Sequence, residues 1–532
     1  MSGNGGEQMI GPWGRFPAAA LCLLLLVVVG CASHSRRTEE ARSALDELRP
    51  KRALELLNKE LQVDGPEDLP ANVTGDQTLL ILDRAMVLQQ LGEYELSSRD
   101  LEVADKSIEL LDFSRNALDD VGKYLFSDSS GPYRAPAYEK LMINTMNMVN
   151  YLVRGDLNGS RVEARRLAVM QKFIEESKDP ADALLGPGSY LAGFTFEKSG
   201  KADEALRYYD EALQYGSYGT LREPVRRLGE SSSYSSPRLR KLLGTEKKET
   251  KQSALEKRAP LVLVLGDAYV RIAPLAAKEG DTTEAKPVSA EGSSAEVTPV
   301  SSTDGASRME AAGAEGPASA ATAASRPADD TGELMVIVGF GRVPEKIPQR
   351  VPIGLALTYC SGILSPYDVN RANELALQGL VTWVNYPEMG EPRGTWGRPT
   401  WQIGTKWQRL EGLIAVDKEA YRAFDAVKGS IVASAITRML ARVAAGQVAK
   451  EAAGKDNALG ILLSLGTQAA LTAADKPDTR SWSTLPARLA VGRVRLAPGR
   501  YEIALNARGF EKQQTVTIRP RGWVVANLTA LN

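Results

Sequence analysis

The sequence of 532 residues predicts a multidomain α+β protein with an N-terminal α-solenoid, a central mixed α/β region and a small C-terminal β-sandwich. Leu, Ala, Glu and Arg recur at helical spacing from Thr38 to about Leu221. From Lys278 to Asp330 the composition changes to small and polar residues, which predicts a disordered insert within the central region. After Pro486, short apolar segments alternate with turn residues, as in small β-sandwiches. A chain of this length needs two or three cores.

Residues 1–30 have the pattern of a secretory signal peptide. After a polar start with Arg15, an uncharged apolar run extends from Ala18 to Gly30, which is too short to span a bilayer comfortably. The run ends in Val28, Val29, Gly30 and Cys31, which resemble the lipobox of bacterial lipoproteins. The resemblance implies cleavage before Cys31, a diacylglyceryl group on its sulfur and an acyl chain such as palmitate on the new amino terminus. A plain signal peptide or a short anchor helix is the alternative.

The acyl chains of Cys31 are therefore expected to hold the protein on a membrane of the bacterial cell envelope. Each buried methylene contributes about 0.8 kcal/mol, so two or more chains anchor firmly. Ala32 rather than Asp follows the cysteine, which under the enterobacterial sorting rule indicates the outer membrane and a fold that faces the periplasm. We expect residues 31–37 to be a flexible tether.

Charge and cysteine content narrow the function classes. The 65 basic and 66 acidic residues give a net charge of −1, and no basic patch is evident, so we expect no nucleic-acid partner. Of three cysteines, Cys22 belongs to the signal and Cys31 to the anchor, which leaves Cys360 without a partner for an intramolecular disulfide. Cys360 lies in an apolar stretch and is expected to be a small buried side chain.

The only histidine is His34, which falls in the predicted tether. A Ser-His-Asp triad, a Cys-His pair and a histidine-based zinc site each need an imidazole inside a fold. We therefore expect no catalytic residue, no metal and no cofactor.

A repeat pattern occurs in the helical segment, predicted as a domain over residues 38–257. Its fullest copy resembles a tetratricopeptide (TPR) repeat, in which a glycine permits the turn and small and aromatic residues fill the space between two helices. It consists of Gly193, Phe196, Gly200, Ala205, Tyr209 and Ala212. A second copy has Ala85, Leu88, Gly92, Ser97, Leu101 and Ala104, and a third has Tyr151, Gly155, Ser160, Ala164 and Leu167. Ala53 and Leu57 fit the second helix of an initial capping copy.

The turn glycines Gly92, Gly155 and Gly200 are 63 and then 45 residues apart, so the array is irregular compared with tandem repeats of about 34 residues. A groove lined by such helices typically binds a peptide or a helix of another protein. The alternative is a helical array that serves only as a spacer.

Residues 258–486 are predicted to form the mixed α/β domain around the insert 278–330. Apolar runs at Pro260–Ala268 and Glu333–Gly339 flank the insert, and we expect them to pair as strands. Another strand is expected at Trp383–Pro387, followed by a loop in which Trp396, Trp401 and Trp407 either stack on a ligand or fill a core edge. A helical hairpin is expected over 420–475, whose second helix contains 16 residues without a charge, 458–473, either buried or resting on the bilayer.

Residues 487–532 are predicted to form the β-sandwich as a separate module. Turn signals at Pro498-Gly499, Arg508-Gly509 and Pro520-Arg521-Gly522 separate four short strands. The stretch Leu496 to Ile503 resembles the turn of PEGA-type envelope modules, which serve as attachment or spacer domains.

Three further motifs, together with the lipobox, resemble an uncharacterised family of bacterial TPR-like envelope lipoproteins. They are Tyr138 to Leu157, Gly341 to Lys346, and Asp478 to Pro486. Members of that family are associated with lipoproteins that resemble penicillin-binding-protein activators, which implies a cell-envelope role and such a lipoprotein as a partner. Asp478, Arg480 and Trp482, with Trp396 and Trp401, are candidate partner contacts. Asp478 and Arg480 alternatively brace the join between helices and sandwich.

The sequence therefore favours a non-catalytic, membrane-anchored scaffold that binds envelope proteins through its TPR-like helices, in cell-wall or outer-membrane assembly. An alternative is an assembly or export factor for surface polysaccharide or outer-membrane protein, whose Trp396 to Trp407 loop contacts the cargo. A third hypothesis is a peptidoglycan-active enzyme with paired carboxylates. Glu139, Asp156 and Glu163 lie in the helical array without a recognisable acid and nucleophile pair.

Overall fold

The computed structural model describes residues 34–113, 133, 135–177, 182–244, 264–265, 268–269, 330–379, 381–392, 397–452 and 476–532. The lipobox, the insert up to residue 329 and the second helix of the predicted hairpin lie outside these residues. The chain divides into one unit of residues 1–245 with 328–532 and a second unit of residues 246–327. In the second unit, β1 (Val264–Leu265) pairs with β2 (Ala268–Tyr269). The first unit is α+β and is described below.

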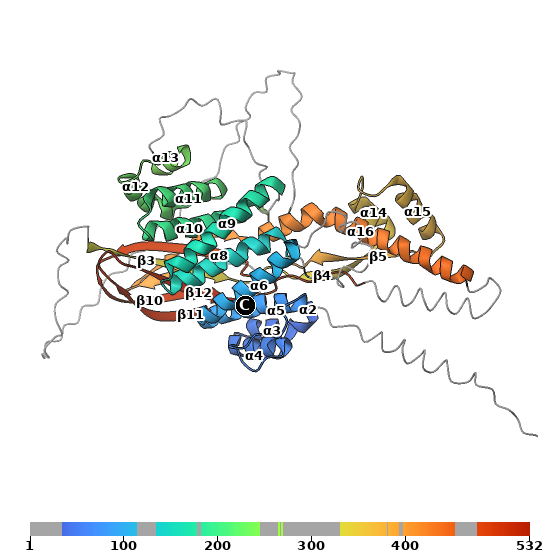
Figure 1. Ribbon diagram of the computed structural model, residues 1–532, viewed down its shortest axis with the longest axis horizontal. Helices are drawn as coiled ribbons and strands as arrows, with labels where there is room; N and C mark the ends of the chain where they lie inside the picture. The colour runs from blue at the N-terminus through green and yellow to red at the C-terminus, as the bar shows by residue number, and fades with distance from the viewer. Residues whose placement is uncertain are drawn as a thin grey trace, which may run out of the picture. The chain divides into compact units, whose positions relative to one another are not determined.

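Helices in consecutive pairs form the N-terminal part of the first unit (Figure 1). The short α2 (His34–Arg37) comes first, and each later pair packs together through a short connection. The pairs are α3 (Glu39–Asp46) with α4 (Pro50–Leu61), α5 (Asp76–Leu91) with α6 (Tyr94–Phe113), α8 (Ala137–Val153) with α9 (Leu157–Ser177), α10 (Leu185–Lys198) with α11 (Ala202–Tyr215), and α12 (Arg222–Gly229) with α13 (Pro237–Leu243).

The predicted turn glycines lie between paired helices. Gly92, Gly155 and Gly200 have φ values of +89°, +77° and +75°, the left-handed region that favours glycine. In the pair α10 and α11, a Cβ on Gly193 would lie 2.4 Å from the ring of Tyr209, so only glycine allows this approach. Ala205, Tyr209 and Ala212 are buried, and Phe196 stacks on Tyr208. The residues of the fullest repeat copy therefore form a closely packed helix pair.

Two four-stranded sheets follow. The first has the order β12 (Trp523–Ala530), β3 (Gly332–Phe340), β9 (Arg488–Leu496) and β8 (Glu411–Ala415), in which β12 and β3 are parallel and the other pairs antiparallel. The second has the antiparallel order β11 (Phe510–Ile518), β10 (Gly499–Ala507), β6 (Thr400–Ile403) and β7 (Lys406–Arg409).

Strand β3 is buried on both faces, because its alternate side chains enter two different cores. Leu334, Val336 and Val338 share a core with Ile503 and Leu505 of the second sheet. On the other face, Met335 and Ile337 belong to a core that is continuous with the helices. The described part of the unit therefore has three layers, with the first sheet between the helices and the second sheet.

Two predictions about the strands are wrong. Both edges of β3 are occupied by β12 and β9, and in the described residues of the run at Pro260–Ala268, Val264–Leu265 pairs with β2 instead. Residues 487–532 do not form a separate module, because their strands are shared between two sheets that also contain strands from residues 332–415. Because β3 has apolar side chains on both faces, both faces must be buried by other parts of the protein. A separate C-terminal module would not bury them.

A smaller group of elements, called the lobe below, has its own core. It consists of β4 (Lys346–Pro352), α14 (Ile353–Tyr359), α15 (Pro366–Leu377) and β5 (Trp383–Met389). The strands β4 and β5 pair antiparallel, and the helices pack on the long α16 (Val416–Ala452), at the right-hand side of Figure 1. Ala356 and Cys360 pack there against Ile436 of α16, so Cys360 is buried as predicted. None of the described helices is long and apolar enough to cross a membrane.

Candidate functional site

The prediction of a flexible tether is wrong for residues 34–37, whereas residues 31–33 lie outside the described residues. His34 begins α2, is only 1% exposed, and its Nε2 lies 3.0 Å from Oδ2 of Asp83 on α5. Thr38 Oγ1 also donates to the His34 carbonyl at 3.0 Å. The described fold therefore begins three residues after Cys31, and the imidazole lies inside it, contrary to the argument that excluded histidine chemistry.

Asp83 also receives hydrogen bonds from a segment far along the chain. Ser483 Oγ donates to Oδ2 at 2.9 Å, and the amide and hydroxyl of Thr484 donate to Oδ1 at 2.9 and 3.0 Å. In a nucleophilic triad the imidazole lies between the hydroxyl and the carboxylate, whereas here the carboxylate lies between the other two groups. All three side chains are also buried. The arrangement therefore satisfies buried polar groups and offers no accessible nucleophile.

Glu139 makes a second connection to the same segment. Its carboxylate accepts from the amide of Trp482 at 3.0 Å and from the hydroxyls of Tyr133 and Tyr138. Burial raises the pKa of this carboxyl, against the opposing effect of these donors. Glu139 is fully buried, and so is Glu163 at 2% exposed, so neither carboxylate is open to a sugar substrate.

Arg480 and Arg342 complete this polar junction. Arg480 bonds Asp478 Oδ2 at 2.6 Å and Asp76 Oδ1 at 3.3 Å. Arg342, after the left-handed Gly341, donates to the carbonyls of Arg42 and Leu531 and to Asp46. The described residues of the three motifs that carry the family resemblance thus meet in space, through Glu139 with Trp482 and through the Val343 amide with the Leu485 carbonyl at 2.9 Å.

The junction decides between the two roles proposed for residues 478–486. Arg480 is 5% exposed and Trp482 1%, and both face the helices. Asp478 and Arg480 therefore brace the join between helices and sheets, and Trp482 presents no surface to a partner in this structure. Asp83 and Ser483 are 400 residues apart in the sequence, so no local sequence pattern predicts the hydrogen bond between them.

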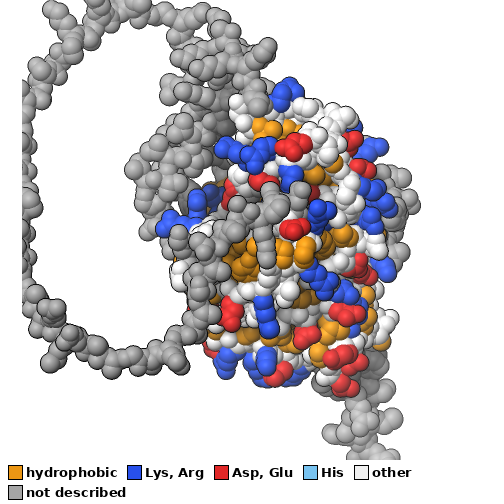
Figure 2. Space-filling view, turned by 90° about the vertical axis from the view of Figure 1, so that its left-hand side faces the viewer, with side chains coloured by type: hydrophobic (Ala, Val, Ile, Leu, Met, Phe, Trp, Pro, Cys, Tyr) orange, Lys and Arg blue, Asp and Glu red, His pale blue; other side chains and the backbone are white. Residues whose placement is uncertain are grey.

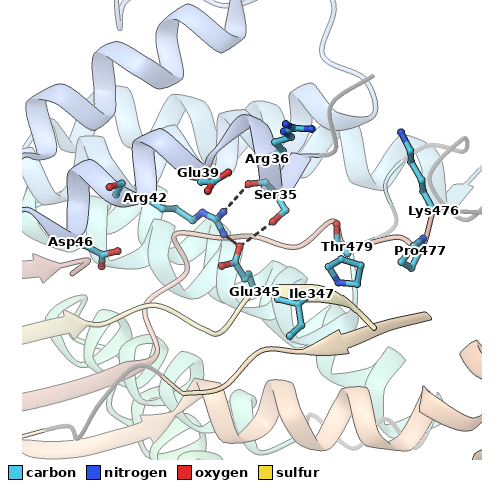
Figure 3. A pocket seen from close by; sticks show the side chains of 12 residues that line it. Ser35, Arg36, Glu39, Arg42, Asp46, Glu345, Ile347, Lys476, Pro477 and Thr479 are labelled. Carbon is cyan, nitrogen blue, oxygen red and sulfur yellow. Dashed lines mark hydrogen bonds and ion pairs between the residues drawn. The ribbon is translucent and has the colours of Figure 1, made fainter. Parts of the chain in front are cut away.

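A cavity of about 480 Å³ lies beside the junction, within the size range of ligand pockets (Figure 3). Arg42 forms an ion pair with Glu345, and Ser35 Oγ donates to the same carboxylate at 3.0 Å. The rim adds Arg36 and Lys476 as cations and Glu39 and Asp46 as anions. Since both signs of charge line it, the cavity has no strong preference for an anion or a cation.

The tryptophans predicted as a loop cluster have different surroundings. Trp401 lies in β6, is 4% exposed and fills the core between the two sheets, so it is not available to a cargo. Trp407 in β7 is 47% exposed, and Trp396 lies outside the described residues. In the hairpin of β6 and β7, Trp401 is paired with Gln408 and Trp407 with Gln402, so the two tryptophans lie on opposite faces of the sheet. One face is in the core and the other is at the surface.

Sequence reasoning missed a second buried charged cluster, between α10 and the first sheet. Arg493 of β9 donates to Glu333 Oε1 at 2.7 Å and to Glu197 Oε2 at 3.0 Å, and lies over the ring of Phe194. Lys198 and Arg227 also bond Glu197. Coulomb attraction to these three cations holds the pKa of Glu197 well below its usual range, although burial alone would raise it.

The described residues contain no group of three His, Cys, Asp or Glu side chains placed to hold a metal ion. No family model matches the chain, and a search among curated proteins finds no match. Fold and site together define an α+β protein whose helix pairs and sheets are joined by buried polar contacts close to its first described residue.

Proposed function

We propose that the protein is a non-catalytic lipoprotein of the bacterial envelope, anchored through Cys31 and acting as a scaffold for envelope proteins. The observation that carries this proposal is the position of His34. Three residues of extended chain span at most about 11 Å, so acyl chains on Cys31 would hold the folded unit directly at the membrane. A folded unit kept within this distance of a bilayer is suited to holding envelope proteins at the membrane surface.

The helical part is proposed to be an irregular TPR-like α-solenoid, and the two sheets a β-sandwich assembled from residues 332–530. The first helices of three pairs, α5, α8 and α10, are buried almost all round and pack against the first sheet. Thr529 of β12 bonds Gln89 of α5 at 2.9 Å, for example. The inner face, where a solenoid of this kind typically takes a peptide, is thus covered by the chain's own strands.

A protein partner would therefore bind the outward helices. Val162 and Val169 on α9 are 48% and 72% exposed, and their spacing of seven residues places them on one face of the helix. A penicillin-binding-protein-activator-type lipoprotein is the partner that the family resemblance suggests, and the outer membrane, on its periplasmic side, is the proposed location.

Two experiments in intact bacterial cells test this function. In the first, Cys31→Ala is expected to leave the fold intact and to abolish acylation, detected by mass spectrometry of the mature amino terminus. A wild-type amino terminus without acyl chains would contradict the anchor.

In the second, a photo-crosslinking amino acid replaces Val169, with Arg500 on β10 as the matched exposed control. We expect one envelope protein to be crosslinked reproducibly from position 169 and not from position 500. Equal recovery from both positions, or none from 169, would contradict the scaffold.

A further inference from the structure

Exposed apolar side chains concentrate on the lobe. Of the twelve large apolar side chains that stand exposed among the described residues, half lie between Ile353 and Trp383. They are Leu355, Tyr359, Ile363, Tyr367, Leu377 and Trp383. Figure 2, which views the unit from the left-hand side of Figure 1, shows acidic and basic side chains interspersed with smaller groups of hydrophobic ones. An apolar concentration of this kind marks an interaction surface.

The lobe has a buried apolar core as well as these exposed side chains. Ala356 on α14 and Cys360, which ends it, lie in the lobe core, while Leu355 and part of the Tyr359 ring are exposed. On α15, Leu375 is buried, whereas Tyr367 is 76% and Leu377 91% exposed. The two helices therefore carry apolar residues on the face that points away from their own core as well as on the face that packs in it.

The polar groups among these side chains suit a lipid headgroup layer. The exposed Arg350 lies 5.5 Å from the ring centre of Trp383, whereas Lys428, 4.8 Å from that of Tyr359, is already held in an ion pair by Glu388. Tryptophan and tyrosine favour the membrane interface, where neighbouring cations reach the phosphates. Between Tyr367 and Leu377, Arg371 and Glu374 neutralise each other in an ion pair at 3.2 Å.

The lobe begins where the anchor would be. Ser35, four residues after Cys31, bonds Glu345, and β4 starts at the next residue, Lys346. Four extended residues span at most about 14 Å, so the acyl chains would enter the bilayer close to the base of the lobe.

We propose that the lobe is a membrane-contact surface: its exposed aromatic and aliphatic side chains lie in the lipid interface that holds the Cys31 acyl chains. This inference rests on the proposed lipidation. The lipid anchor and the lobe together fix the orientation of the unit, so that β4, α14 and α15 face the bilayer and the second sheet does not.

The test uses the lipidated full chain in vesicles of phosphatidylethanolamine and phosphatidylglycerol. In a Cys360→Ala background, one fluorophore is attached at Tyr367→Cys and, as control, at Arg500→Cys in the second sheet. Lipids with a nitroxide near the headgroup are expected to quench the fluorophore at position 367 several-fold more than that at 500. Leu377→Glu is expected to reduce quenching at 367, whereas Leu69→Glu, at an exposed apolar residue outside the lobe, is expected to leave it unchanged.

The outcomes separate this inference from the proposed function. If the protein is washed off the vesicles by carbonate at high pH, the lipid anchor fails. If it stays on the vesicles but position 367 is quenched no more than position 500, the lobe inference is overturned and the anchor stands. Disulfide crosslinks between two copies of the Tyr367→Cys variant on the vesicles would show that a second copy covers the lobe. If deletion of residues 458–473 makes position 367 more accessible, that segment covers the lobe. Both results overturn the lipid contact.

Discussion

His34 and Asp83 are 49 residues apart in the chain and lie 3.0 Å apart in the protein interior, where they fix the start of the fold to helix α5. The same carboxylate accepts hydrogen bonds from Ser483 and Thr484, in the segment that precedes β9. One buried acidic side chain therefore joins three distant parts of the sequence.

Asp83→Ala is expected to destabilise the protein by at least about 3 kcal/mol, because each buried donor left without an acceptor costs about 1–3 kcal/mol. The donors are His34 Nε2, Ser483 Oγ and the Thr484 amide. Urea unfolding followed by circular dichroism measures the loss, and the exposed Asp64→Ala serves as control. Equal midpoints for the two variants would show that the junction is not needed for stability.

Arg493→Ala is expected to cost about 3–5 kcal/mol, since it removes the most buried of the three cations that contact the carboxylates of Glu197 and Glu333. Arg500→Ala, on the exposed surface of β10, is expected to change stability by less than about 0.5 kcal/mol. Thermal unfolding of both variants at pH 7 makes the comparison. A loss for Arg493→Ala no larger than that of the control would mean that the remaining cations, Lys198 and Arg227, are sufficient.

Three glycine substitutions distinguish the free-energy cost of a steric clash from the cost of an unfavourable backbone conformation. Gly193→Ala forces a methyl group into the Tyr209 ring, whose hydroxyl is held by Glu197, and is expected to cost about 1–3 kcal/mol or more. Gly200→Ala places a side chain at φ +75° and is expected to cost about 1–2 kcal/mol. Gly354→Ala, in α14 with open space around it, is expected to stabilise by about 0.5–1 kcal/mol. A different rank order in urea unfolding would contradict the helix packing described above.

Glu163 gives the stability a pH dependence. Burial raises its pKa from 4.5 to about 7, although Arg166 and Asn144 favour the charged form. Between these two pH values the folded protein holds a proton that the unfolded chain has released, so the Glu163 contribution to stability falls as the pH rises through this window. The stability of Glu163→Gln relative to that of the wild type is expected to rise from pH 4.5 to pH 7 and then to level off. Urea unfolding at several pH values, with Glu204→Gln as control, checks this; a constant difference across the range would contradict it.

The sequence predicted features that depend on neighbouring residues. The glycines Gly92, Gly155 and Gly200 mark their turns because each is followed by a helix with small residues at fixed spacing. Cys360 was predicted to be buried from its apolar neighbours alone. The contacts of the junction and of the second charged cluster were not predictable, because Asp83 with Ser483 and Glu197 with Arg493 pair residues hundreds of positions apart. His34 was misplaced for the same reason: its partner lies on a different helix, and nothing beside it in the sequence is apolar.

The order in which the chain is made has a consequence for how it folds. Helices α5 and α8 are covered by β12, and Gln89 meets Thr529 across 440 residues. During synthesis or export from the amino terminus, these helices emerge long before the strand that shields them. Non-local contacts of this kind form slowly and leave apolar surface open to aggregation. The exposed apolar surface of these helices therefore has to be kept from aggregating until β12 has been synthesised. A chain that ends before Trp523 is expected to be degraded rather than to persist as a smaller helical protein.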